Sequence, residues 1–196
     1  MIRLGARLRV PGHAAIVPGN TKIYLQSDGI RYYILHMHLD TVDLSILATL
    51  QSEGRVTNSD LAVRVGLTPA PTLQRVRKLE DAGIIRRYAA ILDPESLGLQ
   101  VTVFVSVVMV SHGREATDRF VAAVSDLPEV LECHHLAGDE DFLLKVVARS
   151  PADYERFLLE KLCAIEGVQR VNTKFVLSSP KSTTELPIGT REPARL

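Results

Sequence analysis

The sequence predicts an α+β protein with two domains, a helical domain over residues 38–92 and a β-α-β-β-α-β domain over residues 101–188. Three observations predict it: three short helical segments in the first range, alternating strand and helix patterns in the second, and opposite charge balances in the two. We expect residues 93–100 to be a linker and 189–196 a tail. Hydrophobic residues make up 46% of the 196 residues, enough for a folded core.

Residues 1–37 read as an extra N-terminal segment. They show no sustained period and carry Pro11, Gly12, Pro18, Gly19 and Gly29, although residues 30–35 have the composition of a short strand. Regular patterning begins just after Met37. We therefore expect Met37 to be the true start, and the preceding residues to be a mis-annotated start or a loose arm. The mass of the native protein tests this expectation, which a chain that begins at Met1 contradicts.

The composition argues against several classes of protein. The longest apolar run, Val101 to Val110, has the length of a strand rather than of a membrane span, and the N-terminus lacks the apolar region of a secretory signal. Cys133 and Cys163 form neither a disulfide framework nor a zinc site. We expect a cytoplasmic protein without metal or cofactor.

Two helices are predicted before residue 66. Asp40 is a suitable N-cap for a helix that runs to about Ser52, where Gly54 stops it. A second helix starts near Asn58, which can cap it, and turns apolar residues inward. The apolar positions are Leu44, Ile46, Leu47 and Leu50 in the first helix and Leu61, Ala62 and Val65 in the second.

A tight turn and a third helix follow. Gly66 supplies the turn because glycine adopts a left-handed backbone at little cost. Thr68 is a good N-cap with Pro69 in the first helical position, and the helix runs to about Ala82. Its predicted buried stripe is Leu73, Val76 and Leu79. Gly83 ends it, and residues 84–91 read as a short wing or strand.

Three short helices with a glycine turn between the second and third predict a helix-turn-helix, although a small helical bundle without a DNA role has the same spacing. The face of the third helix opposite the Leu73 stripe has small residues first and cations later, an order that suits the major groove. We expect Gln74 and Arg75 to contact base edges and Arg77, Lys78 and Arg87 to contact phosphates. The predicted DNA-binding set is Asn58, Thr68, Ala70, Pro71, Gln74, Arg75, Arg77, Lys78 and Arg87.

The charge distribution separates the two halves, although the whole chain has a net charge of zero. Residues 55–88 carry seven basic and three acidic side chains, whereas residues 92–177 carry eight basic and fourteen acidic ones. A basic module joined to an acidic one is typical of a protein that contacts phosphate with one end. Chance variation between solvated surfaces is the alternative.

The second half alternates between strands and helices. Strands are predicted over residues 101–110, 130–136, 142–148 and 168–177, with a polar turn at residues 137–140. One helix carries Ala116, Phe120, Val124 and Leu127, and Asp153 can cap another that ends at Gly167. This order is the ferredoxin-like plan, two helices on one face of a four-stranded antiparallel sheet. The uncovered face is a candidate dimer contact.

From Leu39 to about Ile188 the sequence resembles the Lrp/AsnC family of leucine-responsive regulators. Its motifs occur in order with matching spacing, and the first 36 residues have no counterpart in the family. The motifs are Leu39-Asp40-x-x-Asp43, Gly54-Arg55, Val65-Gly66-Leu67-Thr68, Arg75-Val76-Arg77-Lys78-Leu79-Glu80, Gly83-Ile84-Ile85, Leu97-Gly98-Leu99, Gly138-Asp139-x-Asp141-Phe142-Leu143-Leu144-Lys145 and Thr183-Thr184-Glu185-Leu186-Pro187.

The resemblance implies a winged helix-turn-helix joined to a ligand-sensing domain of the RAM/ACT-like kind. It implies sequence-specific binding to double-stranded operator DNA, and dimers that assemble further into tetramers or octamers. An amino-acid effector is expected between subunits near the turn of residues 138–141. Turn amides can hold a carboxylate, and Asp139 or Asp141 can pair with an ammonium group, although Asp141 can equally serve to cap a hairpin. The expected effector set is His134, Leu136, Gly138, Asp139 and Asp141.

Two other functions stay open at this stage. Adjacent histidines in a strand point to opposite faces, so His134 and His135 cannot bind one metal together, and we expect one at the sheet interface and one near the effector. They also keep open an enzyme on the same scaffold, resembling sirohaem decarboxylases, which has no need of a cationic recognition helix. The other alternative is an architectural DNA-binding protein that responds to no effector.

Overall fold

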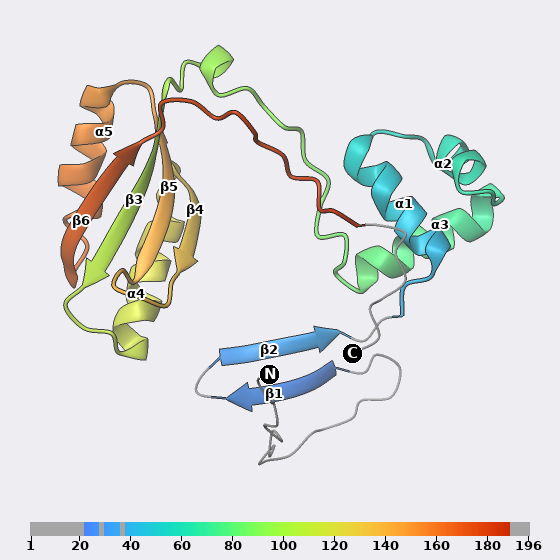
Figure 1. Cartoon of the computed structure of the whole chain (residues 1–196), viewed down its shortest axis with the longest axis horizontal. Helices are drawn as coiled ribbons and strands as arrows, with labels where there is room; N and C mark the ends of the chain where they lie inside the picture. The colour runs from blue at the N-terminus through green and yellow to red at the C-terminus, as the bar shows by residue number, and fades with distance from the viewer. Residues whose placement is uncertain (1–21, 28–29, 36–37, 189–196) are drawn as a thin grey trace, which may run out of the picture. The chain divides into compact units, whose positions relative to one another are not determined.

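The computed structural model describes residues 22–27, 30–35 and 38–188, with side chains from residue 38 onward. The proposed start at Met37 and the tail of residues 189–196 lie outside these residues. The described residues form two compact units, one made of residues 22–27, 30–35, 38–89 and 184–188, and the other of Ala90–Thr183. The first holds the helices α1 to α3 and the second the four-stranded sheet (Figure 1).

The first unit begins with a two-stranded hairpin. The strands β1 (Lys22–Ser27) and β2 (Ile30–Leu35) pair in antiparallel register, with Ser27 opposite Ile30. The strand expected over residues 30–35 is therefore present, and its partner lies immediately before it in the sequence.

Three helices follow the hairpin, and each begins at a polar cap. Helix α1 (Thr41–Ser52) is capped by Asp40 as predicted. Helix α2 (Asn58–Arg64) is capped by Thr57, whose hydroxyl accepts the Asp60 amide hydrogen at 3.1 Å. The expectation that Asn58 caps α2 is wrong, because a threonine one residue earlier already occupies the extended position from which a hydroxyl reaches that amide.

Helix α3 (Pro69–Asp81) follows the turn at Gly66, whose φ of 70° is the left-handed value expected of glycine there. The buried side of α3 differs from the prediction. Thr72 is fully buried and Leu73 is 38% exposed, whereas Leu79 is buried as expected. Thr72 tolerates burial because its hydroxyl donates to the Thr68 carbonyl at 3.0 Å.

Ile46, Leu61 and Leu79 form the buried centre that holds the three helices together. The segment of residues 84–91, expected to form a wing or strand, contains no strand in the structure. It leads to the short helix η1 (Glu95–Leu97).

The second unit is an antiparallel sheet in the order β4-β5-β3-β6. Along the chain, β3 (Val101–Met109) is followed by α4 (Arg114–Ser125), β4 (Val130–His135) and β5 (Phe142–Ala148). Helix α5 (Pro151–Phe157), its π-helical extension η2 (Leu158–Leu162) and β6 (Val168–Phe175) complete the unit. The predicted β-α-β-β-α-β order is confirmed.

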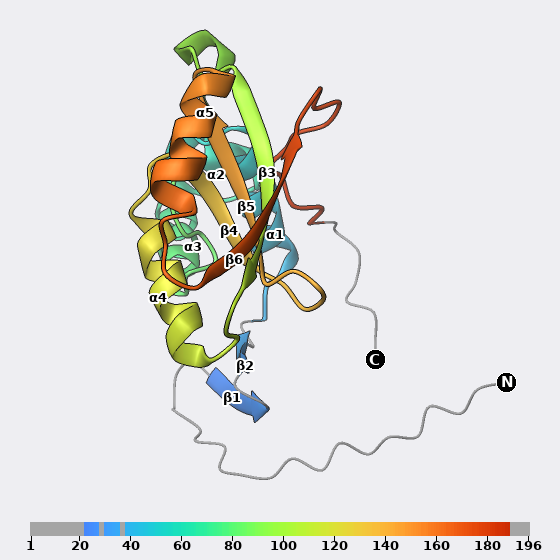
Figure 2. The same ribbon diagram turned by 90° about the vertical axis from the view of Figure 1, so that its left-hand side faces the viewer.

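Both helices of this unit cover the same face of the sheet (Figure 2). The alternating residues Val103, Val105 and Val107 of β3 are fully buried beneath them, together with Phe120 of α4 and Phe157 of α5. Helix α5 begins after Ser150, whose hydroxyl accepts the Asp153 amide hydrogen at 3.1 Å. The expectation that Asp153 caps this helix is therefore wrong by one turn, because Ser150 precedes Pro151 at the helix start.

The opposite face of the sheet has no helix within the unit to cover it (Figure 2). It presents partly buried apolar side chains such as Phe104, Val108 and Leu143 beside charged ones such as Glu132 and Lys145. Among the described residues, no helix has both the length and the apolar character needed to cross a membrane.

Candidate functional site

Helix α3 presents an exposed face that begins at its first residues. Thr68, Ala70 and Gln74 are exposed and Pro71 is half-buried. The Thr68 side chain makes no capping hydrogen bond, so its hydroxyl is available to an external acceptor. The small side chains at positions 70 and 71 leave room for a close approach by another molecule.

Exposed cations lie on α3 and in the segments before α2 and after α3. Within residues 38–89, five exposed cationic side chains have no ion-pair partner among the residues that the structure describes. They are Arg55, Arg77, Lys78, Arg86 and Arg87. Arg64, by contrast, is 2.6 Å from Glu53. Cations that are fully solvated and unpaired are those that can neutralise phosphates without losing an existing partner.

Asn58, one of the predicted DNA-binding residues, has a role inside the domain. Its side-chain amide donates to the carbonyl of Pro69 at 2.8 Å. Because the Pro69 carbonyl belongs to the first residue of α3, this bond ties the start of α2 to the start of α3. The Asn58 amide nitrogen therefore helps to fix the helix-turn-helix angle.

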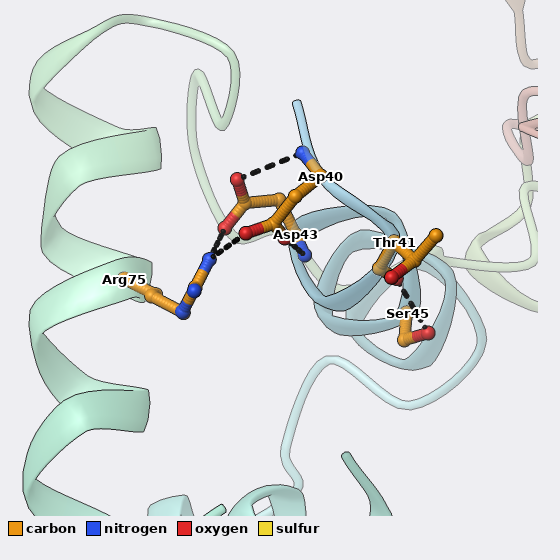
Figure 3. A network of polar contacts seen from close by, with 5 residues as sticks. All are labelled: Asp40, Thr41, Asp43, Ser45 and Arg75. Atoms are coloured by element: carbon orange, nitrogen blue, oxygen red, sulfur yellow. Dashed lines mark hydrogen bonds and ion pairs between the residues drawn. The ribbon is translucent and has the colours of Figure 1, made fainter. Parts of the chain in front are cut away.

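Arg75, the predicted base-reading residue, turns toward α1. Its Nη1 lies 2.7 Å from Asp40 Oδ2 and 2.7 Å from Asp43 Oδ1 (Figure 3). Asp43 is only 4% exposed. The hydrogen bonds that Arg75 donates to Asp43 and Asp40 raise the pKa of Arg75, and the pKa of Asp40 is lowered by the bond from the Asp43 amide and then by the bond from Arg75. The expectation that Arg75 points away from the domain is wrong.

The turn between β4 and β5 is open to solvent. It is closed at its base by a hydrogen bond from the Leu136 amide to the Asp141 carbonyl at 2.8 Å. Gly138 has a φ of 149°, a value that favours glycine, and Gly138 and Asp139 are exposed. Within the described residues, the amides of residues 138–140 donate to no acceptor, which leaves a row of N–H groups that an anion can accept.

Both carboxylate oxygens of Asp141 have partners within the folded chain. Its Oδ2 accepts the Met109 amide hydrogen at 2.7 Å, and its Oδ1 is 2.7 Å from His112 Nδ1. Burial acts to raise the pKa of Asp141, but the bond from Met109 and the neighbouring His112 outweigh it, so the net pKa is lowered. Of the two predicted roles for this carboxylate, the geometry favours the structural one.

The two adjacent histidines point to opposite faces, as expected of a strand. His134 lies opposite Leu143 on the uncovered face, with its Nε2 3.0 Å from Glu132. His135 lies opposite Phe142 and stacks on its ring with centroids 4.9 Å apart. No group of three or more His, Cys, Asp or Glu side chains in the described part of the chain is placed to hold a metal ion.

A cavity of about 430 Å³ lies at the far end of β5 from this turn. Its lining combines apolar side chains, such as Val147 and Phe157, with charged side chains of both signs. The bases are Arg149, Arg156 and Lys161, and the acids are Glu129, Asp153 and Glu160. Lys161 is paired with Glu129, whereas Arg149 has no ion-pair partner among the described residues. With acids and bases in equal number around it, this cavity is a second place in the same unit where a small zwitterionic molecule could fit.

Two functional contacts escaped the sequence reasoning. Asp40 was predicted as an N-cap and Asp43 was noted only as part of a resemblance, but the contact of both acids with Arg75 was not predicted; their spacing of three residues is the available signal of a capping box. His112 lies in a loop without any periodic pattern, so nothing local predicts its contact with Asp141.

Comparison with known proteins matches both units. Residues 39–86 match the model of a winged helix-turn-helix DNA-binding domain, and residues 102–186 match the Lrp/AsnC ligand binding domain. The leucine-responsive regulatory proteins of Salmonella typhimurium and Escherichia coli are 40% and 39% identical over 153 residues, which cover 78% of this chain and 93% of each relative.

Solved structures agree with the sequence relatives. A transcriptional regulator from Neisseria meningitidis, crystallised as a complex with L-Met, is 42% identical with a TM-score of 0.73, covering 77% of this chain and 97% of that one. An AsnC family transcriptional regulator from Agrobacterium tumefaciens is 41% identical with a TM-score of 0.72, covering 76% and 97%. The chain belongs to the Lrp/AsnC family of transcriptional regulators.

Proposed function

We propose that this regulator binds operator DNA as a homodimer through the exposed face of α3, and that a small amino acid bound at the turn of residues 137–140 changes that binding. The observation that carries the DNA part is the unpaired polar surface of α3, above all Gln74, Arg77 and Lys78. Because its relatives are named as regulators, we infer that it is not an enzyme and acts in the cytoplasm, where DNA lies.

The side chains of α3 divide into two roles. Gln74 has an amide that can pair with an adenine edge in the major groove, and Ala70 and Pro71 let the helix approach closely. Arg77, Lys78 and Arg87 contact phosphates, each adding affinity that falls as salt rises. Asn58 and Arg75 serve the fold and leave base reading to Thr68 and Gln74.

The dimer contact is the uncovered face of the sheet. An apolar strip that contains Phe104, Val108 and Leu143 is left without a helix over it, and a second copy of the same face buries it symmetrically. The flanking charges on this face are already matched within one chain, since Glu132 lies 3.2 Å from Lys145. Dimers then place two α3 helices at successive turns of DNA, and further assembly into tetramers or octamers follows the family.

The effector is expected to be a free amino acid whose carboxylate accepts the unbonded amides of residues 138–140. With the Asp141 carboxylate committed to Met109 and His112, Asp139 is the acid left to meet the ammonium group. Leu136, 38% exposed beside the turn, offers an apolar contact. A relative of 42% identity was crystallised with L-Met, which makes L-methionine and L-leucine the first probes.

The effector can change DNA binding only by favouring one assembly or conformation over another, and the coupling is reciprocal. An effector that weakens DNA binding must itself be bound more weakly by the DNA-bound protein. Whether regulation is positive or negative depends on where the operator lies relative to a promoter.

Two binding experiments test the proposal. The first measures fluorescence anisotropy of the full chain with a duplex that it selects from a random-sequence pool, against a scrambled duplex, from 50 to 200 mM salt. The second measures the melting temperature with L-methionine and L-leucine, since a ligand that binds only the folded state raises it. Gly138→Ala and Arg149→Ala distinguish the turn from the cavity.

The account expects preference for the selected duplex, a strong salt dependence, and an amino-acid response that Gly138→Ala removes and Arg149→Ala retains. A response that Arg149→Ala removes instead moves the effector to the cavity near Phe157. A DNA affinity that no amino acid changes favours an architectural protein, and a tetrapyrrole ligand without DNA binding favours the enzyme alternative.

A further inference from the structure

The contact between α1 and Arg75 joins the start of the domain to the middle of α3. Asp40 and Asp43 precede Arg75 by 35 and 32 residues, and one guanidinium nitrogen lies 2.7 Å from a carboxylate oxygen of each (Figure 3). Charge-assisted bonds of this length are the strong class of hydrogen bond. The link therefore spans the whole helix-turn-helix.

Hydrogen bonds within α1 orient the two carboxylates independently of Arg75. Asp40 Oδ1 accepts the Asp43 amide hydrogen at 2.8 Å, and Asp43 Oδ2 accepts the Asp40 amide hydrogen at 3.3 Å. This reciprocal capping box occupies one oxygen of each acid and leaves the other oxygen for Arg75. The acceptors consequently have little freedom to follow a displaced arginine.

The burial of Asp43 makes the loss of this contact energetically costly. Asp43 is buried, and an ionised carboxylate that loses the cation paired with it in such a place is strongly destabilised. Arg75 is itself only 34% exposed. On α3, Gln74 immediately before it and Arg77 two residues after it are exposed, so in sequence the anchored residue lies between the residues proposed to read bases and to contact phosphate.

We propose that Arg75 is a positioning residue for DNA recognition, which sets the orientation of α3 through the Asp40–Asp43 capping box and makes no DNA contact of its own. The proposal rests on α3 entering the major groove. The two can fail separately. DNA binding by the wild-type protein tests the proposed function, and DNA binding by the variants tests the positioning role of Arg75.

Replacement of Asp43, a buried acid that cannot contact DNA, distinguishes a positioning role of Arg75 from a direct contact of Arg75 with DNA. If Arg75 positions α3, then Asp43→Asn and Arg75→Gln weaken binding to the selected duplex to a similar extent, about tenfold each. The double variant is then no weaker than the worse single variant, because both remove the same link. The slope of log K against log salt stays at the wild-type value because no phosphate contact is lost.

If Arg75 contacts DNA, Arg75→Gln changes the base preference or lowers the salt slope by about 1, and Asp43→Asn leaves binding unchanged or tighter. That outcome overturns the proposal. So does a purely structural result, in which the variants melt earlier but bind the duplex as tightly as wild type at a temperature where each is folded.

Matched variants keep the experiment decisive. Asp60→Asn removes an acid at the equivalent position of α2, whose hydrogen bonds among the described residues are with the Thr57 cap, and is expected to bind DNA as wild type does. Asp40→Asn retains a capping side chain and loses a single ion pair, so it serves if Asp43→Asn fails to fold. Its affinity is expected to fall less than that of Arg75→Gln, with an unchanged salt slope; a wild-type affinity contradicts the proposal.

Discussion

Asp141 holds the end of β3 to the start of β5, with its Oδ2 accepting the Met109 amide hydrogen at 2.7 Å. The Asp141 amide in turn donates to the Val107 carbonyl at 2.9 Å. Asp141 of the Gly138-Asp139-x-Asp141 motif is thus bonded to the edge of β3 just before β5 begins, and it fixes the base of the turn that we propose to hold the effector.

Asp141→Asn is expected to destabilise the sensing domain by about 1–3 kcal/mol, because the part-buried charge-assisted bond from the Met109 amide is weakened. The folded pKa of Asp141 is lowered, so its contribution to stability is complete above the unfolded pKa of about 3.9 and lost as the pH falls through the folded value. Thermal melts between pH 7 and pH 3 measure both effects.

The exposed neighbour serves as the control for Asp141. Asp139→Asn removes a carboxylate with no partner among the described residues and is expected to leave the melting temperature of the free protein unchanged while weakening the amino-acid response. Equal melting temperatures for Asp141→Asn and wild type at pH 7 contradict the structural role of Asp141.

Gly138→Ala tests the turn without adding a clash. A Cβ at this position meets nothing within 4 Å, but the φ of 149° is strained for any L side chain. We expect the turn to relax, so that the melting-temperature rise with L-methionine or L-leucine is lost while DNA affinity without effector stays at the wild-type value. Retention of the full effector response shows that the turn does not bind it.

Gln51 of α1 fixes the segment that follows the sensing domain. Its side-chain amide accepts the Leu186 amide hydrogen at 2.7 Å and donates to the Leu186 carbonyl at 3.2 Å. Gln51→Ala is expected to release this segment and to lower the stability of the helical unit by about 1 kcal/mol. Hydrogen exchange at the Leu186 amide measures the release.

Ser52→Ala is the matched control for Gln51, since the Ser52 hydroxyl bonds only to carbonyls of its own helix. Leu186 exchange is expected to stay slow in that variant. Equal exchange rates at Leu186 in Gln51→Ala and in wild type show that the side-chain contact does not hold the segment in solution.

The proposed dimer face makes a separate prediction. Leu143→Glu places a charge in the apolar strip of the uncovered sheet face and is expected to yield monomers by light scattering, with weaker DNA binding because two half-sites are no longer linked. Leu159→Glu is the control, because Leu159 is 62% exposed on η2 on the other side of the sheet. Dimers that survive Leu143→Glu place the interface elsewhere.

The sequence predicts the elements well where local chemistry decides them. Asp40, Gly66 and Pro69 each impose a cap, a turn or a helix start through their own backbone and side chain, and the structure has all three as expected. The sequence does not predict that Thr72 rather than Leu73 is buried on α3, because apolar spacing takes no account of the hydrogen bond from Thr72 to its own helix.

The site is harder to predict than the fold because its contacts join distant residues. Periodicity assigns a polar residue such as Arg75 to the outward face, whereas two carboxylates more than 30 residues earlier draw it inward. Asp141 meets partners 32 and 29 residues before it, at Met109 and His112. Such pairings depend on how helices and strands pack, which spacing along one element does not encode.

The most direct test of the central claim is the affinity of Arg77→Ala and Lys78→Ala for the selected duplex across a salt series, with Arg119→Ala on α4 as the control. If α3 meets the DNA backbone, each of the first two variants weakens binding and lowers the salt slope by about 1 while keeping the sequence preference. The Arg119 variant is expected to match wild type. Wild-type affinity and slope in both α3 variants contradict the claim that this helix is the DNA-binding surface.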